Sequence, residues 1–258
     1  MNQVFELDLS GKLSRQCDLG IWNDIVCDIG PSIVQRIEQF DSVSTNNMDK
    51  RLSLQVEMTP AIKLQINTGG GSFPWHFDNP GPPNKRILTC IFYLNPSWEE
   101  GDGGEIVLWP FLSPSITIQP LHKRAVFFFS DRILHRVMPS KTRRVCFTMW
   151  CNGVKANTPK DVVLTKEVLQ FRTYDEAQSF FTTSPLQRVI SRAVYSEEYL
   201  ESLLECLVSK HETTTDDESK CVTKEEKELI IKQHHASVMG IVNKLRPLIN
   251  EFRKRKYS

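Results

Sequence analysis

Three features that classify many proteins quickly are missing from this sequence. It has no uncharged apolar stretch of about 18 residues, so we expect no membrane-spanning helix. Its first twelve residues lack a basic region followed by an apolar run, so we expect no secretory signal. Its formal net charge is only +1, so no global field favours nucleic acid or a membrane surface as partner.

The cysteines also lack a pattern. There are seven, an odd number, and they are scattered along the chain. Cys146 and Cys151 are too far apart for a C-x-x-C motif. We therefore expect no disulfide framework, mostly buried thiols and a reducing compartment. Together with the missing secretory signal, this predicts a cytoplasmic or nuclear location.

Short alternating runs of apolar and polar residues fill the middle of the chain, residues 51–157. Asn-Pro, Gly-rich and Pro-rich segments separate these runs, as turns separate strands. Many short strands with regular turn signals are typical of a double-sheet jelly roll, or double-stranded β-helix. The expected strands lie at residues 51–58, 61–67, 86–95, 105–109, 116–119 and 124–129.

Helical periodicity flanks this predicted core on both sides, which makes the expected fold class α+β. In residues 1–50, apolar positions recur at helical spacing, so we expect N-terminal helices that pack on the core. Residues 158–258 predict a C-terminal helical region that binds a partner, dimerises or covers the site. Its expected helices are 162–171, 184–210 and 224–245, and Pro247 should end or kink the last one.

The last basic run, RKRK at residues 253–256, has two readings. We expect a solvated basic tail, and a nuclear-import or polyanion-binding patch is the alternative.

His76, Asp78 and His135 form the strongest chemical pattern in the sequence. Residues two apart on a strand point to the same face, so His76 and Asp78 can present an imidazole and a carboxylate to one point. A second imidazole from a distant strand, His135, completes a set of two histidines and one carboxylate. That set suits Fe(II) and leaves coordination positions open, as in non-haem iron oxygenases.

Arg144 follows His135 by nine residues and shares one face of an expected strand with Thr148. A guanidinium there would bind a carboxylate with two hydrogen bonds at the far end of the same cavity. The expected strand 86–95 places Ile91 and Tyr93 on one face, and the Tyr93 phenol would be a second donor to that carboxylate.

Five segments together resemble the 2-oxoglutarate/Fe(II) dioxygenases, and most closely their prolyl 4-hydroxylase branch with the oxygen-sensing prolyl hydroxylases. They are HFDNP (76–80), ILTCIFYLN (87–95), GDGGEIVLWP (101–110), FFFSDRILHRV (127–137) and TRRVCFTMW (142–150). The resemblance covers roughly residues 60–152.

The resemblance implies an enzyme that hydroxylates prolyl residues of a protein or peptide, with succinate and carbon dioxide as co-products. It implies Fe(2+) on His76, Asp78 and His135, with 2-oxoglutarate and O2 as co-substrates and ascorbate as an optional reductant. The 2-oxoglutarate carboxylate would lie at Arg144, Tyr93 and Thr148. Ile106 aligns with a position that lines the family's cofactor pocket, and Ile91 would add to this dry wall.

One position departs from the oxygen-sensing branch, which has a tyrosine ten residues before the first iron-binding histidine. Here that position is Ile66, so one cofactor hydrogen bond is either missing or supplied elsewhere, with Gln65 and Asn67 as the candidates. Two other functions stay open. One is oxygenation of a different substrate; nucleic acid is disfavoured because Trp150 stands where nucleic-acid-repair oxygenases have a second arginine. The other is a catalytically silent binding or scaffold module.

Overall fold

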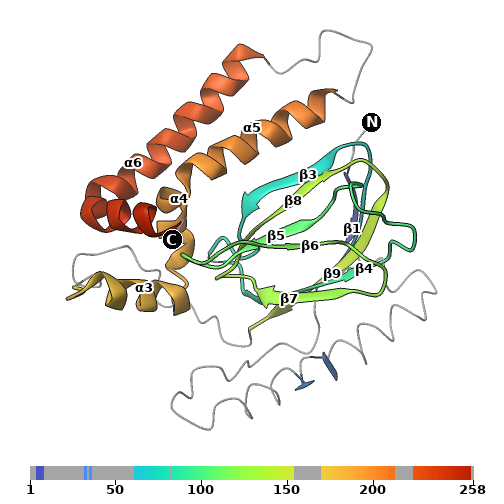
Figure 1. Cartoon of the computed structure of the whole chain (residues 1–258), viewed down its shortest axis with the longest axis horizontal. Coiled ribbons are helices and arrows are strands. Elements are labelled where there is room, and N and C mark those ends of the chain that lie inside the picture. The colour runs from blue at the N-terminus through green and yellow to red at the C-terminus, as the bar shows by residue number, and fades with distance from the viewer. Residues whose placement is uncertain are drawn as a thin grey trace.

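The chain folds into two antiparallel β-sheets with helices from its C-terminal part along one side (Figure 1). The computed structural model describes residues 4–8, 32–33, 35–36, 61–81, 83–153, 170–212 and 223–256. Most of the expected N-terminal helices, the expected strand 51–58 and most of the expected helix 162–171 lie outside the described residues. The two sheets and the helices beside them confirm the predicted α+β class.

The first sheet has the strand order β1-β2-β9-β4-β7, and the second has the order β3-β8-β5-β6. All neighbouring strands in both sheets run antiparallel. The first sheet comprises β1 (Val4–Asp8), β2 (Ala61–Asn67), β4 (Arg86–Tyr93), β7 (Ala125–Phe129) and β9 (Arg144–Asn152). The second comprises β3 (Gly71–His76), β5 (Ile106–Trp109), β6 (Ile116–Ile118) and β8 (Leu134–Ser140).

Alternation along the strands separates two hydrophobic layers of the first sheet. On β4, Ile91 and Tyr93 face the second sheet and pack with Ile106 of β5. Leu88 and Cys90 face the other way and pack with residues of β2 and β9. The layer between the sheets is therefore the one that surrounds the site described below.

The C-terminal helices share a hydrophobic core with the second sheet. They are α3 (Tyr174–Thr183), α4 (Gln187–Val194), α5 (Ser196–Glu212) and α6 (Lys224–Arg255). Phe181, Ile190 and Phe252 of these helices are fully buried in one cluster with Trp75 of β3 and Leu134 of β8. α5 runs along β3 (Figure 1), so the edge of the second sheet is covered.

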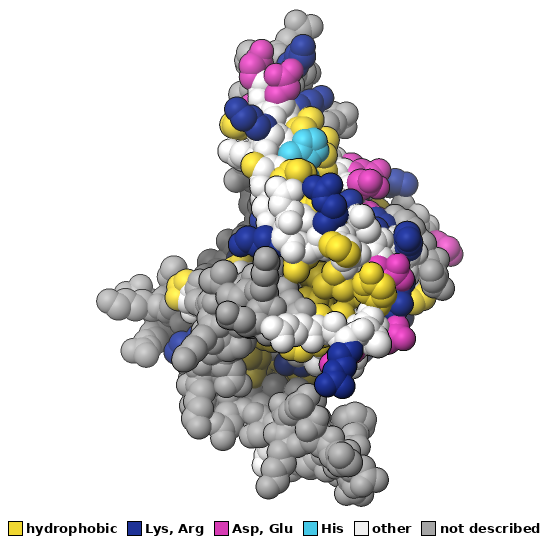
Figure 2. All heavy atoms as spheres, turned by 90° about the vertical axis from the view of Figure 1, so that its left-hand side faces the viewer, with side chains coloured by type: hydrophobic (Ala, Val, Ile, Leu, Met, Phe, Trp, Pro, Cys, Tyr) yellow, Lys and Arg dark blue, Asp and Glu magenta, His cyan; other side chains and the backbone are white. Residues whose placement is uncertain are grey.

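Seen from the side of the helices, hydrophobic side chains gather in one area, with basic and acidic side chains around it (Figure 2). No helix within the described ranges combines the length and the apolar character that crossing a membrane requires.

Residues 4–8 differ from the expected N-terminal helices, because they form strand β1. VFELD alternates apolar and polar residues, and the segment pairs with β2 from Val4↔Asn67 to Asp8↔Lys63. A period of two over five residues is too short to predict a strand without its partner. The edge of the first sheet supplies that partner.

The expected helix 184–210 is divided at Tyr195, which is fully buried and has non-helical backbone angles. Its hydroxyl accepts a hydrogen bond from the Leu112 amide at 2.8 Å, and its ring packs on Trp109 at 4.5 Å. This contact with the sheet ends α4. The kink expected near Pro247 is confirmed, because α6 has non-helical angles at Leu245.

The basic run 253–256 is neither a solvated tail nor an open basic patch. Arg253 donates to the Ala193 carbonyl at the end of α4. Arg255 pairs with Asp175, and Lys256 pairs with Glu198. The run joins α6 to α3, α4 and α5, and only this tertiary packing could have revealed it.

Candidate metal centre

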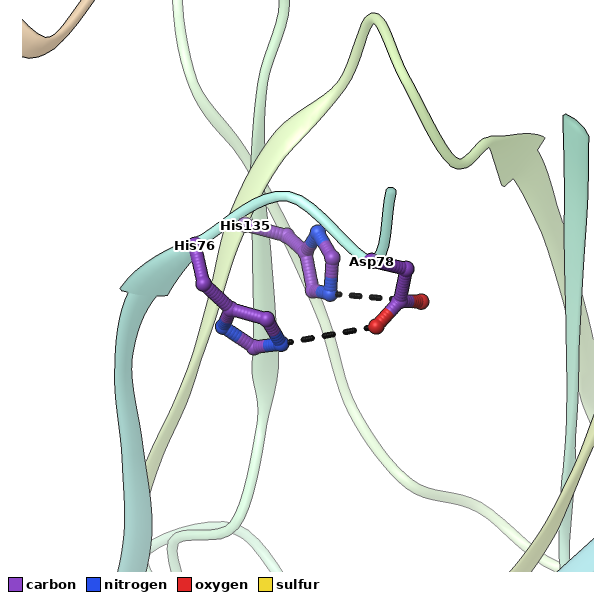
Figure 3. A group of neighbouring side chains, drawn as sticks. All are labelled: His76, Asp78 and His135. Carbon is purple, nitrogen blue, oxygen red and sulfur yellow. Dashed lines mark ion pairs between the residues drawn. The ribbon is translucent and has the colours of Figure 1, made fainter. Parts of the chain in front are cut away.

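His76 and His135 lie opposite each other on neighbouring strands of the second sheet. His76 ends β3, His135 is near the start of β8, and the two are cross-strand partners. Asp78 follows His76 by two residues and turns its carboxylate toward both rings (Figure 3). The antiparallel pairing therefore brings together two residues that are 59 positions apart (135 − 76).

The three side chains converge on one point. The carboxylate of Asp78 lies 3.6 Å from Nε2 of His76 and 3.7 Å from Nε2 of His135. One ligand atom from each residue can be chosen so that all lie within 4.8 Å of one another. This spacing matches a set of ligands around one metal ion.

Backbone carbonyls fix the tautomer of both rings. Nδ1 of His76 lies 2.8 Å from the Pro74 oxygen, and Nδ1 of His135 lies 3.1 Å from the Ile133 oxygen. Because a carbonyl oxygen only accepts, each Nδ1 carries the hydrogen and each Nε2 presents its lone pair. Hydrogen bonds of this kind orient metal-binding histidines.

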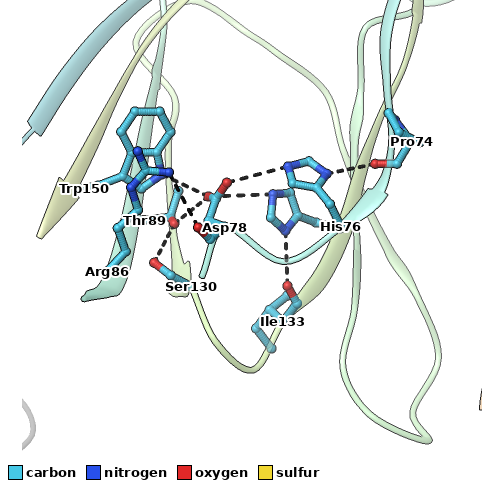
Figure 4. A network of polar contacts seen from close by, with 9 residues as sticks. Pro74, His76, Asp78, Arg86, Thr89, Ser130, Ile133 and Trp150 are labelled. Atoms are coloured by element: carbon cyan, nitrogen blue, oxygen red, sulfur yellow. Dashed lines mark hydrogen bonds and ion pairs between the residues drawn. The ribbon is translucent and has the colours of Figure 1, made fainter. Parts of the chain in front are cut away.

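Two donors hold the Asp78 carboxylate from behind (Figure 4). Its Oδ2 accepts from the Thr89 hydroxyl at 2.7 Å and from the Trp150 indole at 3.1 Å. Because the Thr89 hydrogen goes to Asp78, the Ser130 hydroxyl, 2.8 Å away, donates to Thr89. The Arg86 guanidinium lies over the Trp150 ring at 4.0 Å. The carboxylate is therefore oriented by side chains from β4 and β9, which are neighbouring strands of the first sheet.

These contacts set the charges at neutral pH. Burial would raise the pKa of Asp78, but both histidines and the Thr89 hydrogen bond hold it far below its usual value. Burial and the nearby His76 lower the pKa of His135 to about 4. Burial also lowers the pKa of His76, but its interactions with Asp78 outweigh this and raise it. Asp78 is thus an anion and His135 is neutral, the forms that bind metals.

Arg144 lies in the same cavity as the triad, at the start of β9. Its side chain is only 1% exposed, and no acidic group among the described residues pairs with it. Its Nε donates to the Gly104 oxygen at 2.8 Å and its Nη2 to the Tyr93 hydroxyl at 3.4 Å. A buried guanidinium held only by neutral groups fits a ligand that brings its own carboxylate.

Gly104 makes room for this guanidinium. A Cβ there would lie 2.7 Å from Cδ of Arg144 and 3.0 Å from the Ser140 hydroxyl, and the φ of Gly104 is +76°. Only glycine is compatible with both the contact and the backbone conformation. Gly104 is therefore part of the site, which the sequence did not reveal.

One cavity of about 350 Å³ contains the triad and the Arg144 side chain. Of the predicted cofactor residues, Ile91, Ile106 and Thr148 line it. Tyr93 does not; it reaches the site through its hydrogen bond to Arg144. Lys63, Phe73 and Arg86 line it as well, and the sequence reading had missed them. Strand alternation could have identified Lys63, since it shares a face of β2 with Gln65.

Strand β2 also explains the departure at Ile66. Gln65 and Asn67 stand opposite Cys146 and Arg144 on β9, and Gln65 lines the cavity. The Gln65 side-chain NH2 donates to the Asn67 side-chain oxygen at 2.7 Å, and this bond does not use the Gln65 side-chain oxygen. Ile66 lies between them in the alternation and so points to the opposite face. The polar face of β2 is therefore formed by Lys63, Gln65 and Asn67.

The donor set fits both groups that the sequence implied. Two imidazoles that turn Nε2 toward one carboxylate, all on one side of a cavity, leave open positions, which suits Fe(II). The buried Arg144, with no acid beside it among the described residues, suits the far carboxylate of a ketoacid such as 2-oxoglutarate.

Comparison with known proteins agrees with this geometry. Residues 62–152 match the family model described as the 2OG-Fe(II) oxygenase superfamily. Human prolyl hydroxylase EGLN3 is 37% identical over 97 residues, which cover 36% of this chain and 40% of that protein. Human Egl nine homolog 1 is 36% identical over 95 residues, 36% of this chain and 22% of that protein. The chain thus matches well under half the length of these curated relatives.

A solved structure extends the likeness beyond the strands. A prolyl 4-hydroxylase structure from Phytophthora capsici is 34% identical, with a TM-score of 0.68. That match covers 98% of this chain and 77% of the other. The similarity therefore includes the C-terminal helices as well as the sheets.

Proposed function

Because the chain belongs to the 2OG-Fe(II) oxygenase superfamily, we propose that it hydroxylates prolyl residues of a protein or peptide. One observation carries the oxygenase part: the triad and a buried arginine without an acidic partner among the described residues share one cavity. The prolyl part rests on the relatives, which are named as prolyl hydroxylases. The two sheets are proposed to form a double-stranded β-helix.

Under this proposal His76, Asp78 and His135 hold Fe(II). Arg144 binds the far carboxylate of 2-oxoglutarate, and Tyr93 and Thr148 support it with their hydroxyls. When bound, iron and 2-oxoglutarate would supply the oxidising chemistry: 2-oxoglutarate would be decarboxylated to succinate and carbon dioxide, with one oxygen atom of O2 entering succinate and the other a substrate C–H bond.

The protein keeps water from the reacting atoms and fixes the ligand positions. Ile91 and Ile106 give the cavity apolar walls, which strengthen the Arg144 contact by lowering the local dielectric. Thr89 and Trp150 hold the Asp78 carboxylate in one orientation, so the open side of the triad keeps a fixed direction. Holding one C–H bond at that open side is then the task of the substrate-binding surface.

Three further expectations belong to the same proposal. The protein acts in the cytoplasm or nucleus, ascorbate serves as an optional reductant, and the C-terminal helices contact a partner or a second copy. None of the three depends on the chemistry, so one of them can be wrong while the proposed reaction is right.

The test begins with purified protein under anaerobic conditions. Fe(II) and 2-oxoglutarate together should give a visible metal-to-ketoacid charge-transfer band, and His135→Ala should abolish it while circular dichroism shows an intact fold. Turnover in air then follows succinate formation and oxygen incorporation into proline-containing peptides by mass spectrometry. A folded protein with no band would favour the silent scaffold, and a band with hydroxylation of another residue type would favour a different substrate.

A further inference from the structure

A second cavity, of about 320 Å³, lies beside the metal centre on the side of the C-terminal helices. It is bounded by the His76–Pro80 segment and by α4, α5 and α6, close to where β3 ends in Figure 1. Among the residues that line it are His76, Phe77, Arg188, Arg192, Tyr199 and Ile241. None of the roles assigned above uses this cavity.

His76 links this second cavity to the metal centre, because it lines both. Its side chain is 37% exposed, whereas that of His135 is 4% exposed. Phe77 packs against the hydrophobic cluster shared with the helices and lines the second cavity. A peptide whose reacting residue lies at the open side of the triad therefore needs only a short extension to enter the second cavity.

Donors and cations outnumber acceptors among the polar side chains of this cavity. Tyr199 is 6% exposed, and its hydroxyl has no hydrogen-bond partner among the described residues. Arg192 is exposed on α4, and no acidic side chain that the structure describes pairs with it. The Ser237 hydroxyl donates to the His234 carbonyl, so it can only accept here. A buried O–H beside a guanidinium is a donor pair suited to a carboxylate.

Arg188 adds a second positive charge in a fixed position. It packs on Gly81, where a Cβ would lie 2.8 Å from its Nη2. The Arg188 charge acts on the pKa of the Asp131 carboxyl. Asp131 therefore balances part of the positive charge of Arg188. Phe77, Val189 and Ile241 supply apolar walls for the stem of a side chain. The cavity thus combines an apolar stem-binding part with an excess of positive charge.

We propose that this cavity binds an acidic side chain, Asp or Glu, of the polypeptide substrate beside the residue that is hydroxylated. The proposal deepens the proposed function and rests on it for the identity of the reaction. Arg192 and Tyr199 are the residues that determine this specificity. Among the described residues, no hydrogen bond or ion pair joins either of them to the triad or to Arg144.

The test measures binding without turnover. The full chain, with Fe(II) and 2-oxoglutarate and without O2, is titrated into fluorescein-labelled peptides of Ala and Gly around one proline. Each peptide carries a single Asp at one position on either side of the proline, and its matched partner carries Asn there. We expect at least one Asp peptide to bind about tenfold more tightly than its Asn partner, as expected for a charge-assisted contact.

Three variants locate the effect. Arg192→Gln and Tyr199→Phe should reduce the Asp preference to about twofold or less, the second by removing only a hydroxyl. Arg246→Gln is the matched control, because it removes the same charge from an exposed position on α6 outside the cavity. It should leave the preference unchanged. Equal binding of every Asp and Asn pair, or an equal loss in Arg246→Gln, would overturn the proposal.

Turnover of the same peptides in air separates this inference from the proposed function. If proline is hydroxylated with no Asp preference, the function stands and the acidic subsite is wrong. If no peptide is hydroxylated but the preference depends on Arg192 and Tyr199, the subsite stands and the prolyl assignment is wrong.

Discussion

Arg144 is the residue on which the ketoacid assignment depends. It is buried among neutral partners, and a bound carboxylate would be its counter-ion. Arg144→Ala should weaken 2-oxoglutarate binding by about 2–5 kcal/mol, or roughly 30-fold or more in Kd, because the ligand carboxylate would lose its buried partner. Anaerobic calorimetry with Fe(II) measures this directly.

Arg143 provides the matched control for this experiment. It is adjacent in sequence but exposed, so Arg143→Ala removes an equal charge outside the cavity and should leave the Kd within about twofold. Unchanged affinity in Arg144→Ala would contradict the assignment. Equal losses in both variants would indicate a general charge effect.

Thr89 tests whether the orientation of Asp78 matters for metal binding. Thr89→Val keeps the shape but removes the hydroxyl that donates to Asp78 at 2.7 Å. We expect metal affinity to fall about 10–100-fold, as for other hydrogen bonds that orient metal ligands. Competition with a chelator measures the affinity, and Thr117→Val on the exposed strand β6 is the control. A wild-type affinity in Thr89→Val would show that Trp150 alone holds the carboxylate.

The sequence predicted the residues that share a strand face better than those held by loops. The pairing of Arg144 with Thr148 on β9 follows from a period of two, which is a local property. The same period brought His76 and Asp78 together, although β3 ends at His76 and Asp78 lies just beyond it. Gly104 and Arg86 reach the site through contacts between segments far apart in the chain. No local pattern identifies such contacts, so these residues could be found only in the structure.

Among the elements, the edge strand β3 depends on α5. The buried Trp75 amide donates a hydrogen bond to the Ser202 hydroxyl at 3.1 Å. This hydroxyl takes the place of the backbone carbonyl that a further strand would offer. Ser202→Ala should lower the free energy of unfolding by about 1–3 kcal/mol, because a buried N–H loses its acceptor. Urea denaturation checks this, with the exposed Ser179→Ala on α3 as control. Equal stability of the two variants would mean that water replaces the hydroxyl.

Helices and strands with a periodic apolar pattern could be predicted from the sequence. Elements that depend on a single tertiary contact could not. The antiparallel strands and the helix with Pro247 follow from periodicity and from proline chemistry. The strand Val4–Asp8 needs the edge of β2, and the break at Tyr195 needs the Leu112 amide. Both depend on a partner far away in the sequence.

At the scale of the whole molecule, the sheets and the C-terminal helices are joined by one hydrophobic core. Trp75, Phe111 and Leu134 from the sheet region are buried in the same cluster as residues of the helices. Arg136 of β8 also pairs with Glu205 of α5 at 2.6 Å. The helices therefore cover the strand that carries His76, and the second cavity forms between them and that strand.

This shared core predicts that the helical region cannot be removed without loss of the fold. A chain ending at residue 157 would expose Trp75, Phe111 and Leu134 together, and each large apolar side chain contributes about 1.5–3 kcal/mol when buried. We expect this chain to aggregate on gel filtration and to lack a cooperative thermal transition. A milder variant, Ile190→Ala on α4, should fold but lose about 2–5 kcal/mol of stability. A monomeric truncated chain that melts sharply and still gives the charge-transfer band would instead show that the strands fold alone, and the helices would then serve only to bind.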